Sequence, residues 1–287
     1  MNCYNGEAYL QMAIDSVIAQ DYPSWELIFW DNCSTDRSAE LVARYSDQRV
    51  KYFLAPTHTG LYEARNYAIE RASGDLFAFL DVDDWWAPSK LTLQVPLFSD
   101  LEVGLVCGNY WVVKERTRKQ WVRYTRPIPT GWVLNDLLIF YFVGLLTLMV
   151  RRSAFEALSY PCDQRYHMMG DLDLVVRLSM HWRLGCVQEP VAFNRHHDKN
   201  ESHLQRGRHV SELALWISEM SEVDAIRSCD GWQSIQSTHT YLKALSQVSE
   251  GDRQGAARSF GALPWGALKL RLLAVLLAPR VVNRLRY

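Results

Sequence analysis

Segments with helical spacing and segments with strand-like spacing alternate along the first part of the chain. This alternation constrains the fold more than any other feature of the sequence. Helices that alternate with short apolar strands predict βαβ units and a mostly parallel sheet flanked by helices, so we expect an α/β domain. The expected helices are 6–20, 34–46 and 60–74, and the expected strands are 25–31, 49–55 and 75–81.

A domain of this kind should open with a strand, but loop-like residues follow Met1 directly and lead into the first helix. Either the sheet lacks this strand, or the sequence begins about one strand length, roughly seven residues, late. We favour the late start, because the loss of an interior strand would expose its neighbours and remove ladder hydrogen bonds.

The second part of the chain is predicted to be mainly helical from about residue 169, after a mixture of strands and turns between 101 and 168. We assign residues 1–202 to the α/β domain, with one half of about 1–100 and another of about 101–202. Residues 203–287 form a helical C-terminal extension. The expected later helices are the segment that begins GDLDLVV, followed by 206–229, 234–249 and 254–278.

Several protein classes are excluded by the absence of their signals. The longest apolar run, LLIFYFVGLLTLMV at 137–150, is shorter than the roughly 20 residues that span a bilayer, so we expect buried core segments there. The first residues, MNCYNGEAYL, have neither the basic nor the apolar region of a secretory signal. The six cysteines are scattered without zinc spacing or a C-x-x-C pair. We therefore predict reduced thiols and a cytoplasmic location.

The tail of the chain is basic and apolar. Residues 253–287 carry seven basic residues and no acidic ones, so residues 1–252 carry a net charge of −8 within the total of −1. An apolar stretch at 272–278 adjoins basic positions 269, 271, 280, 284 and 286. This pattern suits peripheral contact with the anionic inner face of the cell membrane. The alternative is a helix packed on the rest of the chain with its basic ends in solvent. No nucleic-acid motif is present, so we expect no nucleic-acid partner.

Acidic residues follow two of the predicted strands. Asp31 ends WELIFWD, while LFAFLDVDDWW at 76–86 places Asp81, Asp83 and Asp84 after a buried strand. Ligands of open α/β sheets bind beyond the carboxyl ends of strands. Acids there, with Arg65 nearby, suit a divalent metal and a diphosphate, because hard cations take carboxylate oxygens and arginine pairs with phosphate. The alternative is that the acids cap the helix that starts near Pro88.

Two further acids lie at the start of the helix GDLDLVVRL. Asp171 and Asp173 are two residues apart, so they point in different directions around the helix. Taken alone, Asp171 could cap the helix and Asp173 could pair with Arg177 four residues on. The tryptophans of the acid segment, Trp85 and Trp86, could flank a substrate or seal the core.

In order and spacing, three stretches of the sequence resemble the inverting family 2 glycosyltransferases of the GT-A fold. They are CYNGEAYLQMAIDSVIAQDYPSWELIFWDNCSTDRS, GLYEARNYAIERASGDLFAFLDVDDWW and MGDLDLVVRL. The resemblance covers residues 3 to about 202 and leaves 203–287 outside. It implies a Rossmann-like nucleotide-diphospho-sugar transferase fold. The half at about 1–100 would bind the nucleotide sugar and the half at about 101–202 would bind the acceptor.

The resemblance also implies a set of site residues. The nucleotide sugar would be bound by Tyr4, Asn5, Asp31, Asn32, Arg65, Asp81 and Asp83. The second residue of the family's D-D/N pair is Asn32 here, which leaves the identity of the base open. A Mg²⁺ or Mn²⁺ ion would be held by Asp83, Asp84 and His197, the last lying in R-H-H-D-K-N-E-S at 195–202. Asp171 would be the catalytic base.

The expected function is therefore metal-dependent transfer of a sugar from a nucleotide diphosphate donor, with a UDP-sugar favoured, to a glycan or glycolipid hydroxyl. Bacterial surface polysaccharide synthesis is the expected setting. The alternative is an inactive, truncated homologue that binds nucleotide or acts as a scaffold, which the missing first strand supports.

Overall fold

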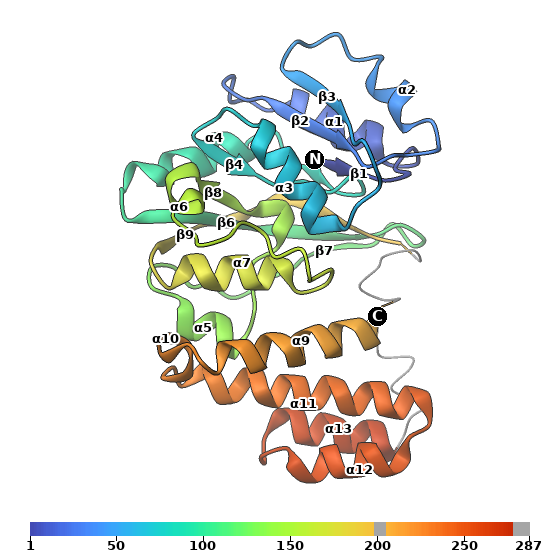
Figure 1. The fold of residues 1–287 in the computed structure, drawn as a ribbon, viewed down its shortest axis with the longest axis vertical. Helices are drawn as coiled ribbons and strands as arrows, with labels where there is room; N and C mark the ends of the chain where they lie inside the picture. Colours follow the sequence, from blue (N-terminus) through green and yellow to red (C-terminus); the bar gives the residue numbers. More distant parts are fainter. Residues whose placement is uncertain (198–204, 278–287) are drawn as a thin grey trace. The chain divides into compact units, whose positions relative to one another are not determined.

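The computed structural model describes residues 1–197 and 205–277, which form two compact units (Figure 1). Unit 1 consists of Met1–Val133 and the described part of Phe142–Asn200. Unit 2 consists of Leu134–Tyr141 and the described residues of the C-terminal part. The sequence assigned 134–141 to the acceptor half, but this segment belongs with the C-terminal helices. The predicted boundary at 202 lies outside the described residues.

The first sheet of unit 1 has three parallel strands in the order β1 (Asn2–Cys3), β2 (Leu27–Asp31) and β3 (Val50–Leu54). The helices that alternate with these strands are α1 (Leu10–Ile18), α2 (Ser38–Val42) and α3 (Leu61–Arg71). Every residue of β2 is buried, as its continuous apolar run predicts. The βαβ alternation read from the sequence is therefore confirmed for this sheet.

The expectation that the chain begins in a loop is wrong in part, because Asn2 and Cys3 form a short strand. They pair in parallel with Trp30 and Asp31 of β2. The amino group of Met1 extends this pairing by donating to the carbonyl of Ile28 at 2.9 Å. A cavity of about 290 Å³ lies beside them, lined by residues of β2, α3 and β4 (Leu76–Ala78).

The second sheet of unit 1 is mixed. Its strands besides β4 are β5 (Trp85–Trp86), β6 (Val103–Lys114), β7 (Gln120–Val122), β8 (Met149–Arg151) and β9 (Arg183–His196). Their order is β4-β8-β6-β9-β5, with β7 paired to β6. The pair β6–β9 is parallel and the other pairs are antiparallel, so the predicted parallel character does not extend to most of this sheet. The remaining helical segments of the unit are α4 (Lys90–Gln94), η1 (Val95–Ser99), η2 (Leu145–Thr147), α6 (Arg152–Glu156) and α7 (Gly170–Ser179).

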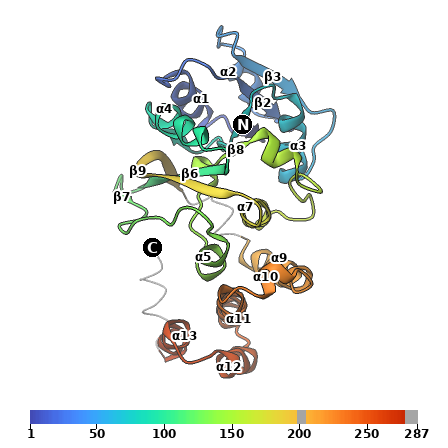
Figure 2. The same cartoon turned by 90° about the vertical axis from the view of Figure 1, so that its left-hand side faces the viewer.

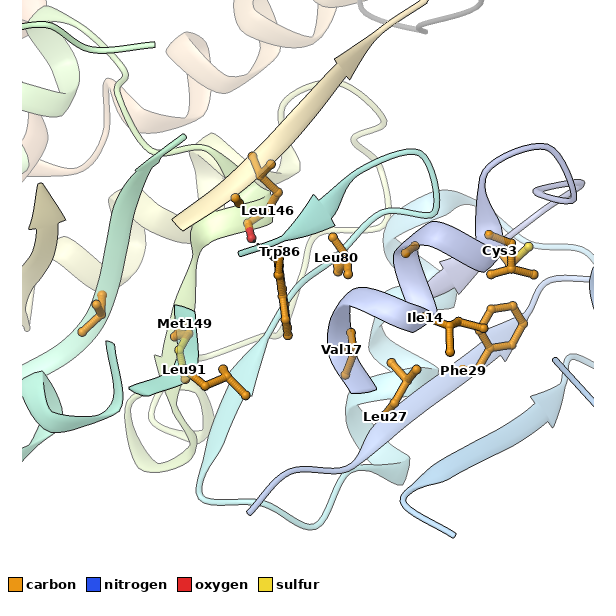
Figure 3. Close-up of a cluster of buried hydrophobic side chains, with 14 of the residues drawn as sticks. Cys3, Ile14, Val17, Leu27, Phe29, Leu80, Trp86, Leu91, Leu146 and Met149 are labelled. Carbon is orange, nitrogen blue, oxygen red and sulfur yellow. Dashed lines mark hydrogen bonds between the residues drawn. The ribbon is translucent and has the colours of Figure 1, made fainter. Parts of the chain in front are cut away.

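One apolar cluster joins α1 and β2 to the second sheet (Figure 3). Ile14 and Val17 of α1 and Phe29 of β2 are buried in it. Trp86 is also buried there, and its indole Nε1 donates to the carbonyl of Leu146 at 2.8 Å. Burial with its one polar atom satisfied makes Trp86 a core residue, which decides between the two alternatives left open for it.

Unit 2 is built from helices around α11 (Gly231–Glu250). This helix contacts α5 (Leu134–Ile139), α9 (Arg206–Met220), α12 (Arg253–Ala262) and α13 (Ala267–Leu277). The short helix α10 (Asp224–Arg227) precedes it, and Figure 2 looks nearly along the axes of α11, α12 and α13. The single helix predicted at 254–278 is wrong, because it divides into α12 and α13. None of the helices in the described ranges is long and apolar enough to cross a membrane.

The basic residues of the tail are only partly available for contact with a membrane. Lys269 is buried, and its Nζ donates to the carbonyl of Leu263 at 2.7 Å, so it joins α13 to the end of α12. Arg271 is exposed. Positions 280, 284 and 286 lie outside the described residues. The sequence could not distinguish these cases, because a lysine that satisfies a helix end has the same one-letter pattern as a solvated one.

Candidate active site

Asp81 and Arg65 form an ion pair just beyond the end of β4. Arg65 lies on α3 and is 6% exposed, and its Nη2 donates to Oδ1 of Asp81 at 2.7 Å. Its guanidinium also lies 4.7 Å from the centre of the Tyr62 ring. The other terminal nitrogen, Nη1, is buried without a hydrogen-bond partner in the part of the chain that is described. A buried donor without a partner is costly, so this nitrogen is available to a bound ligand.

Asp83 faces His197, the first residue after β9. Oδ2 of Asp83 and Nε2 of His197 are 3.1 Å apart. Burial, together with the negative charge of Asp81, raises the pKa of Asp83 above its usual range. The charge of Asp81 and burial therefore both disfavour the ionised form of Asp83. The rest of the R-H-H-D-K-N-E-S segment, 198–202, lies outside the described residues.

Asp84 joins the acid segment to β9. It is 6% exposed, and it accepts hydrogen bonds from Nδ2 of Asn194 at 3.1 and 3.2 Å and from the backbone N–H of Arg195 at 2.8 Å. Burial and the charge of Asp83 raise the pKa of Asp84 well above its usual range. These contacts describe a structural carboxyl group. Its predicted role as a metal ligand stays a prediction, and Asp83 is the stronger candidate.

Four of the seven residues predicted to bind the nucleotide sugar lie at or just after the ends of β1 and β2, and three of these four form hydrogen bonds that hold the adjoining loops. Asp31 is 1% exposed and accepts from the backbone of Ser34 and the hydroxyl of Tyr52. Asn32 exchanges hydrogen bonds with the Thr59 backbone, and Oδ1 of Asn5 accepts from the Thr35 backbone. Tyr4 differs, because this residue is 53% exposed and its ring centre lies 4.2 Å from that of His58.

Asp171 lies at the start of α7, where Tyr62 of α3 docks. The backbone N–H of Asp171 donates to the Tyr62 hydroxyl at 2.9 Å. A side chain at Gly170 would come within 2.5 Å of the Tyr62 ring, so only glycine permits this approach. Burial, followed by the charge of Asp171, raises the pKa of Tyr62, which keeps its hydroxyl protonated.

Asp173 has a different role. It is fully buried, and its Oδ2 accepts from Nε of Arg177 at 2.8 Å, which confirms the pair predicted four residues apart. Arg177 also donates to the carbonyls of Tyr160 and Pro161. Asp173 therefore stabilises α7 and its neighbouring loop.

One helix connects the predicted base to the acid cluster. Tyr62 and Arg65 lie three residues apart, so they share one face of α3. Tyr62 contacts Asp171 and Arg65 contacts Asp81, and both acids are thereby brought to the same face. Sequence reasoning identified Arg65 and Asp171 but missed Tyr62, although an aromatic residue one helical turn before a candidate arginine was a usable signal.

Comparison with known proteins decides the family. A family model described as Glycosyl transferase family 2 matches residues 1–158. This chain belongs to that family. The UDP-Glc:alpha-D-GlcNAc-diphosphoundecaprenol beta-1,3-glucosyltransferase WfgD of Escherichia coli is 32% identical over 161 residues, which is 56% of this chain and 62% of that protein. The amylovoran biosynthesis glycosyltransferase AmsB of Erwinia amylovora is 25% identical over 229 residues, 76% of this chain and 75% of that protein.

Solved glycosyltransferase structures share the fold. S. aureus TarS 1–349 in complex with UDP-GlcNAc superposes with a TM-score of 0.65 at 13% identity, over 90% of this chain and 88% of that chain. The mannosyltransferase PcManGT from Pyrobaculum calidifontis, in complex with GDP-Man and Mn²⁺, gives 0.62 at 20% identity, over 99% and 80%. The predicted α/β, GT-A fold is therefore confirmed. The name of the AmsB relative assigns that protein to amylovoran biosynthesis.

The side chains of Asp83 and His197 offer part of a ligand set for a divalent cation. Within the described ranges, no group of three or more His, Cys, Asp or Glu side chains is arranged to hold a metal by itself. Asp83 and His197 nevertheless present one carboxylate and one imidazole nitrogen 3.1 Å apart. The raised pKa of Asp83 shows that the position disfavours further negative charge, which a cation would offset. Mg²⁺ commonly binds with one or two protein carboxylates and takes its other ligands from phosphates and water.

Proposed function

We propose that this glycosyltransferase moves a sugar from a nucleotide diphosphate donor, with a UDP-sugar favoured, to an acceptor hydroxyl with inversion of the anomeric configuration. One observation carries the proposal. A single face of α3 contacts both Asp171, through Tyr62, and Asp81, through Arg65. The candidate base and the candidate donor site are therefore linked by one rigid helix, as a direct displacement requires.

Donor binding is supported by groups that the protein leaves open. The exposed Tyr4 ring beside His58 offers a stacking surface for the base. Nη1 of Arg65 offers a buried donor for the nucleotide. Asp31, Asn32 and Asn5 shape the loops around these groups through their contacts with Ser34, Thr59 and Thr35.

In the proposed reaction, Asp171 accepts the proton of the attacking acceptor hydroxyl. Its place at the first turn of α7, held by Tyr62, supports this assignment. Asp83 and His197 would hold a Mg²⁺ or Mn²⁺ ion, and this ion would stabilise the charge that develops on the leaving diphosphate. Arg65 holds the Asp81 carboxylate beside the donor site through their ion pair.

For the acceptor we propose a glycan attached to a lipid. The name of the WfgD relative specifies a diphosphoundecaprenol acceptor and UDP-Glc as donor. This chain matches only 62% of that protein, so we carry over the chemical class of acceptor and donor alone.

Peripheral contact with an anionic membrane is proposed for α13. Trp265, just before α13, is 79% exposed, and Leu270 and Leu277 of α13 are 58% and 77% exposed. Exposed Arg271 supplies positive charge beside them, and no acidic residue follows Asp252. A helix with exposed apolar and basic residues suits an anionic lipid surface.

We expect Leu270→Glu to reduce flotation with liposomes that contain anionic lipid. Leu101→Glu, at a 78% exposed leucine of unit 1, is the matched control.

A thermal-shift experiment tests the proposed function. Ligands that bind only the native state raise the melting temperature. We expect UDP with Mn²⁺ to raise it and Asp83→Ala to abolish that rise, while Asp224→Ala, at an exposed acid of α10, keeps it. Absence of any shift with UDP, GDP or their sugars, together with absence of donor hydrolysis, would favour the inactive homologue.

A further inference from the structure

Five planar side chains from three segments of unit 1 form one column beside the acid cluster. Phe193, Arg195 and His197 are spaced two residues apart along and just after β9, so they share one face of the strand. Trp85 of β5 and Tyr9, which precedes α1, occupy the gaps between them. The order along the column is Phe193, Trp85, Arg195, Tyr9 and His197.

Each step of the column is a close contact. Trp85 and Phe193 are partners in the β5–β9 register, and their rings stack at 5.0 Å with an angle of 6°. The Arg195 guanidinium lies 4.7 Å from the Trp85 ring on one side and 4.7 Å from the Tyr9 ring on the other. The Tyr9 and His197 rings stack at 4.9 Å with an angle of 28°. Both cation contacts lie within the range in which a guanidinium is attracted to an aromatic face.

Two side chains of the column, Arg195 and His197, contact the candidate metal ligand Asp83. Nε of Arg195 donates to the carbonyl of Asp83 at 2.9 Å, and Nε2 of His197 lies 3.1 Å from the Asp83 carboxylate. At its outer side, the hydroxyl of Tyr9 donates to Glu115 at 3.1 Å. An imidazole ring can rotate about its side-chain bonds unless a packed face restrains it. The Tyr9 ring supplies that face.

We propose that Tyr9 and Trp85 are positioning residues that fix Arg195 and the His197 imidazole in the orientation that meets the donor diphosphate. The inference rests on the proposed function. Trp85, Tyr9 and Arg195 are half-buried, whereas the neighbouring Trp86 is 7% exposed and belongs to the core. The column therefore lies at the surface of the site, where its rings can order cationic groups toward a ligand.

Substitutions at Tyr9 separate stacking from hydrogen bonding. Tyr9→Phe keeps the ring and removes the bond to Glu115, while Tyr9→Leu removes both. By calorimetric titration of UDP in the presence of Mn²⁺, we expect Tyr9→Phe to bind within about twofold of the parent chain and Tyr9→Leu to bind about tenfold more weakly. The melting temperature without ligand should be similar in both variants. Equal binding by all three chains, or equal loss in both variants, would overturn the proposal.

A nuclear magnetic resonance measurement tests the same geometry without ligand. The Tyr9 ring should shift the imidazole resonances of His197, which are assigned by their loss in His197→Gln. We expect these resonances to move in Tyr9→Leu and to stay in place in Tyr9→Phe. If the parent chain fails to bind UDP, the proposed function fails, and this spectrum alone decides whether the column orients His197. Unchanged His197 resonances in Tyr9→Leu would refute the positioning role.

Discussion

Two pairs of neighbouring acids, Asp83 with Asp84 and Asp171 with Asp173, look alike in sequence but differ in the structure. In each pair one carboxylate is buried among protein donors: Asp84 is 6% exposed and Asp173 is fully buried. The other is more accessible, since the Asp83 side chain is 28% exposed and Asp171 is half-buried. The comparison teaches that the spacing of the acids does not distinguish one from another, while burial and the hydrogen-bond donors around each acid do.

The largest effect is expected at Asp83. Asp83→Ala should lower transfer by roughly a thousandfold, because the charge on the departing diphosphate would lose its stabilisation. The rise in melting temperature given by UDP with Mn²⁺ should disappear as well. Asp84→Asn should keep that rise, since its carboxyl group is held by β9. Full manganese-dependent activity in Asp83→Ala would show that the metal assignment is wrong.

At the second pair, Asp171→Asn should lower kcat by roughly a hundredfold or more, the usual scale for the loss of a general base. An amide keeps the shape of the side chain but cannot accept the acceptor's proton. Affinity for UDP should stay near that of the parent chain, because the base acts only on the acceptor. Kinetics at saturating donor, with calorimetric titration of UDP, separate these effects.

Asp173→Asn should reduce stability more than rate. Removing one charge of a buried ion pair leaves Arg177 without its partner, and such a loss costs about 3 kcal/mol or more. Urea unfolding of the parent and of both variants measures this, with Asp171→Asn as the matched control. A folded but inactive Asp173→Asn beside an active Asp171→Asn would move the catalytic assignment two residues along the chain.

The sequence predicted most of the first sheet because local periodicity defines its elements. α1 repeats apolar residues at Leu10, Ala13, Ile14 and Val17, and β2 is apolar throughout until it ends at Asp31. β9 was missed because Pro190 and several charged residues interrupt its pattern, and register shifts around Asn109 of β6 accommodate the irregularity. That miss concealed the column of stacked side chains, since Arg195 and Trp85 meet only when β5 pairs with β9.

The roles within the acid pairs were also only partly predictable. The pair of Asp173 with Arg177 follows from a spacing of four residues on one helix, so it could be derived from the sequence. The contacts of Asp84 with Asn194 and Arg195 join positions more than 100 residues apart, so no local pattern contains them. Tyr62 belongs to the same class, since its contact with Asp171 depends on how α3 and α7 pack.

The amino group of Met1 is a buried charge of the opposite sign, and it extends the comparison of the acids to a basic group. The effect expected from its titration is the smallest of those predicted here. It donates to the carbonyl of Ile28, and burial lowers its pKa to about 6 from 8.0, with Asp81 opposing the shift.

Between these two pKa values the unfolded chain binds more protons than the folded chain. The free energy of unfolding should therefore rise with pH from about 6 to about 8 and level off above pH 8. A pKa change from 8.0 to about 6 corresponds to about 2.7 kcal/mol, but Met1 as a whole is only half-buried, so solvent screens part of this effect and the rise should be roughly 1–2 kcal/mol. A chain acetylated at Met1 is the control, because its amide does not titrate and the adjoining cavity of about 290 Å³ has room for the added group. Titration of other groups, such as His209, is common to both chains and cancels in the difference. Identical pH profiles of unfolding for the two chains would show that the amino group is solvated in the folded state, and the comparison of buried with accessible charges would then be limited to the acids.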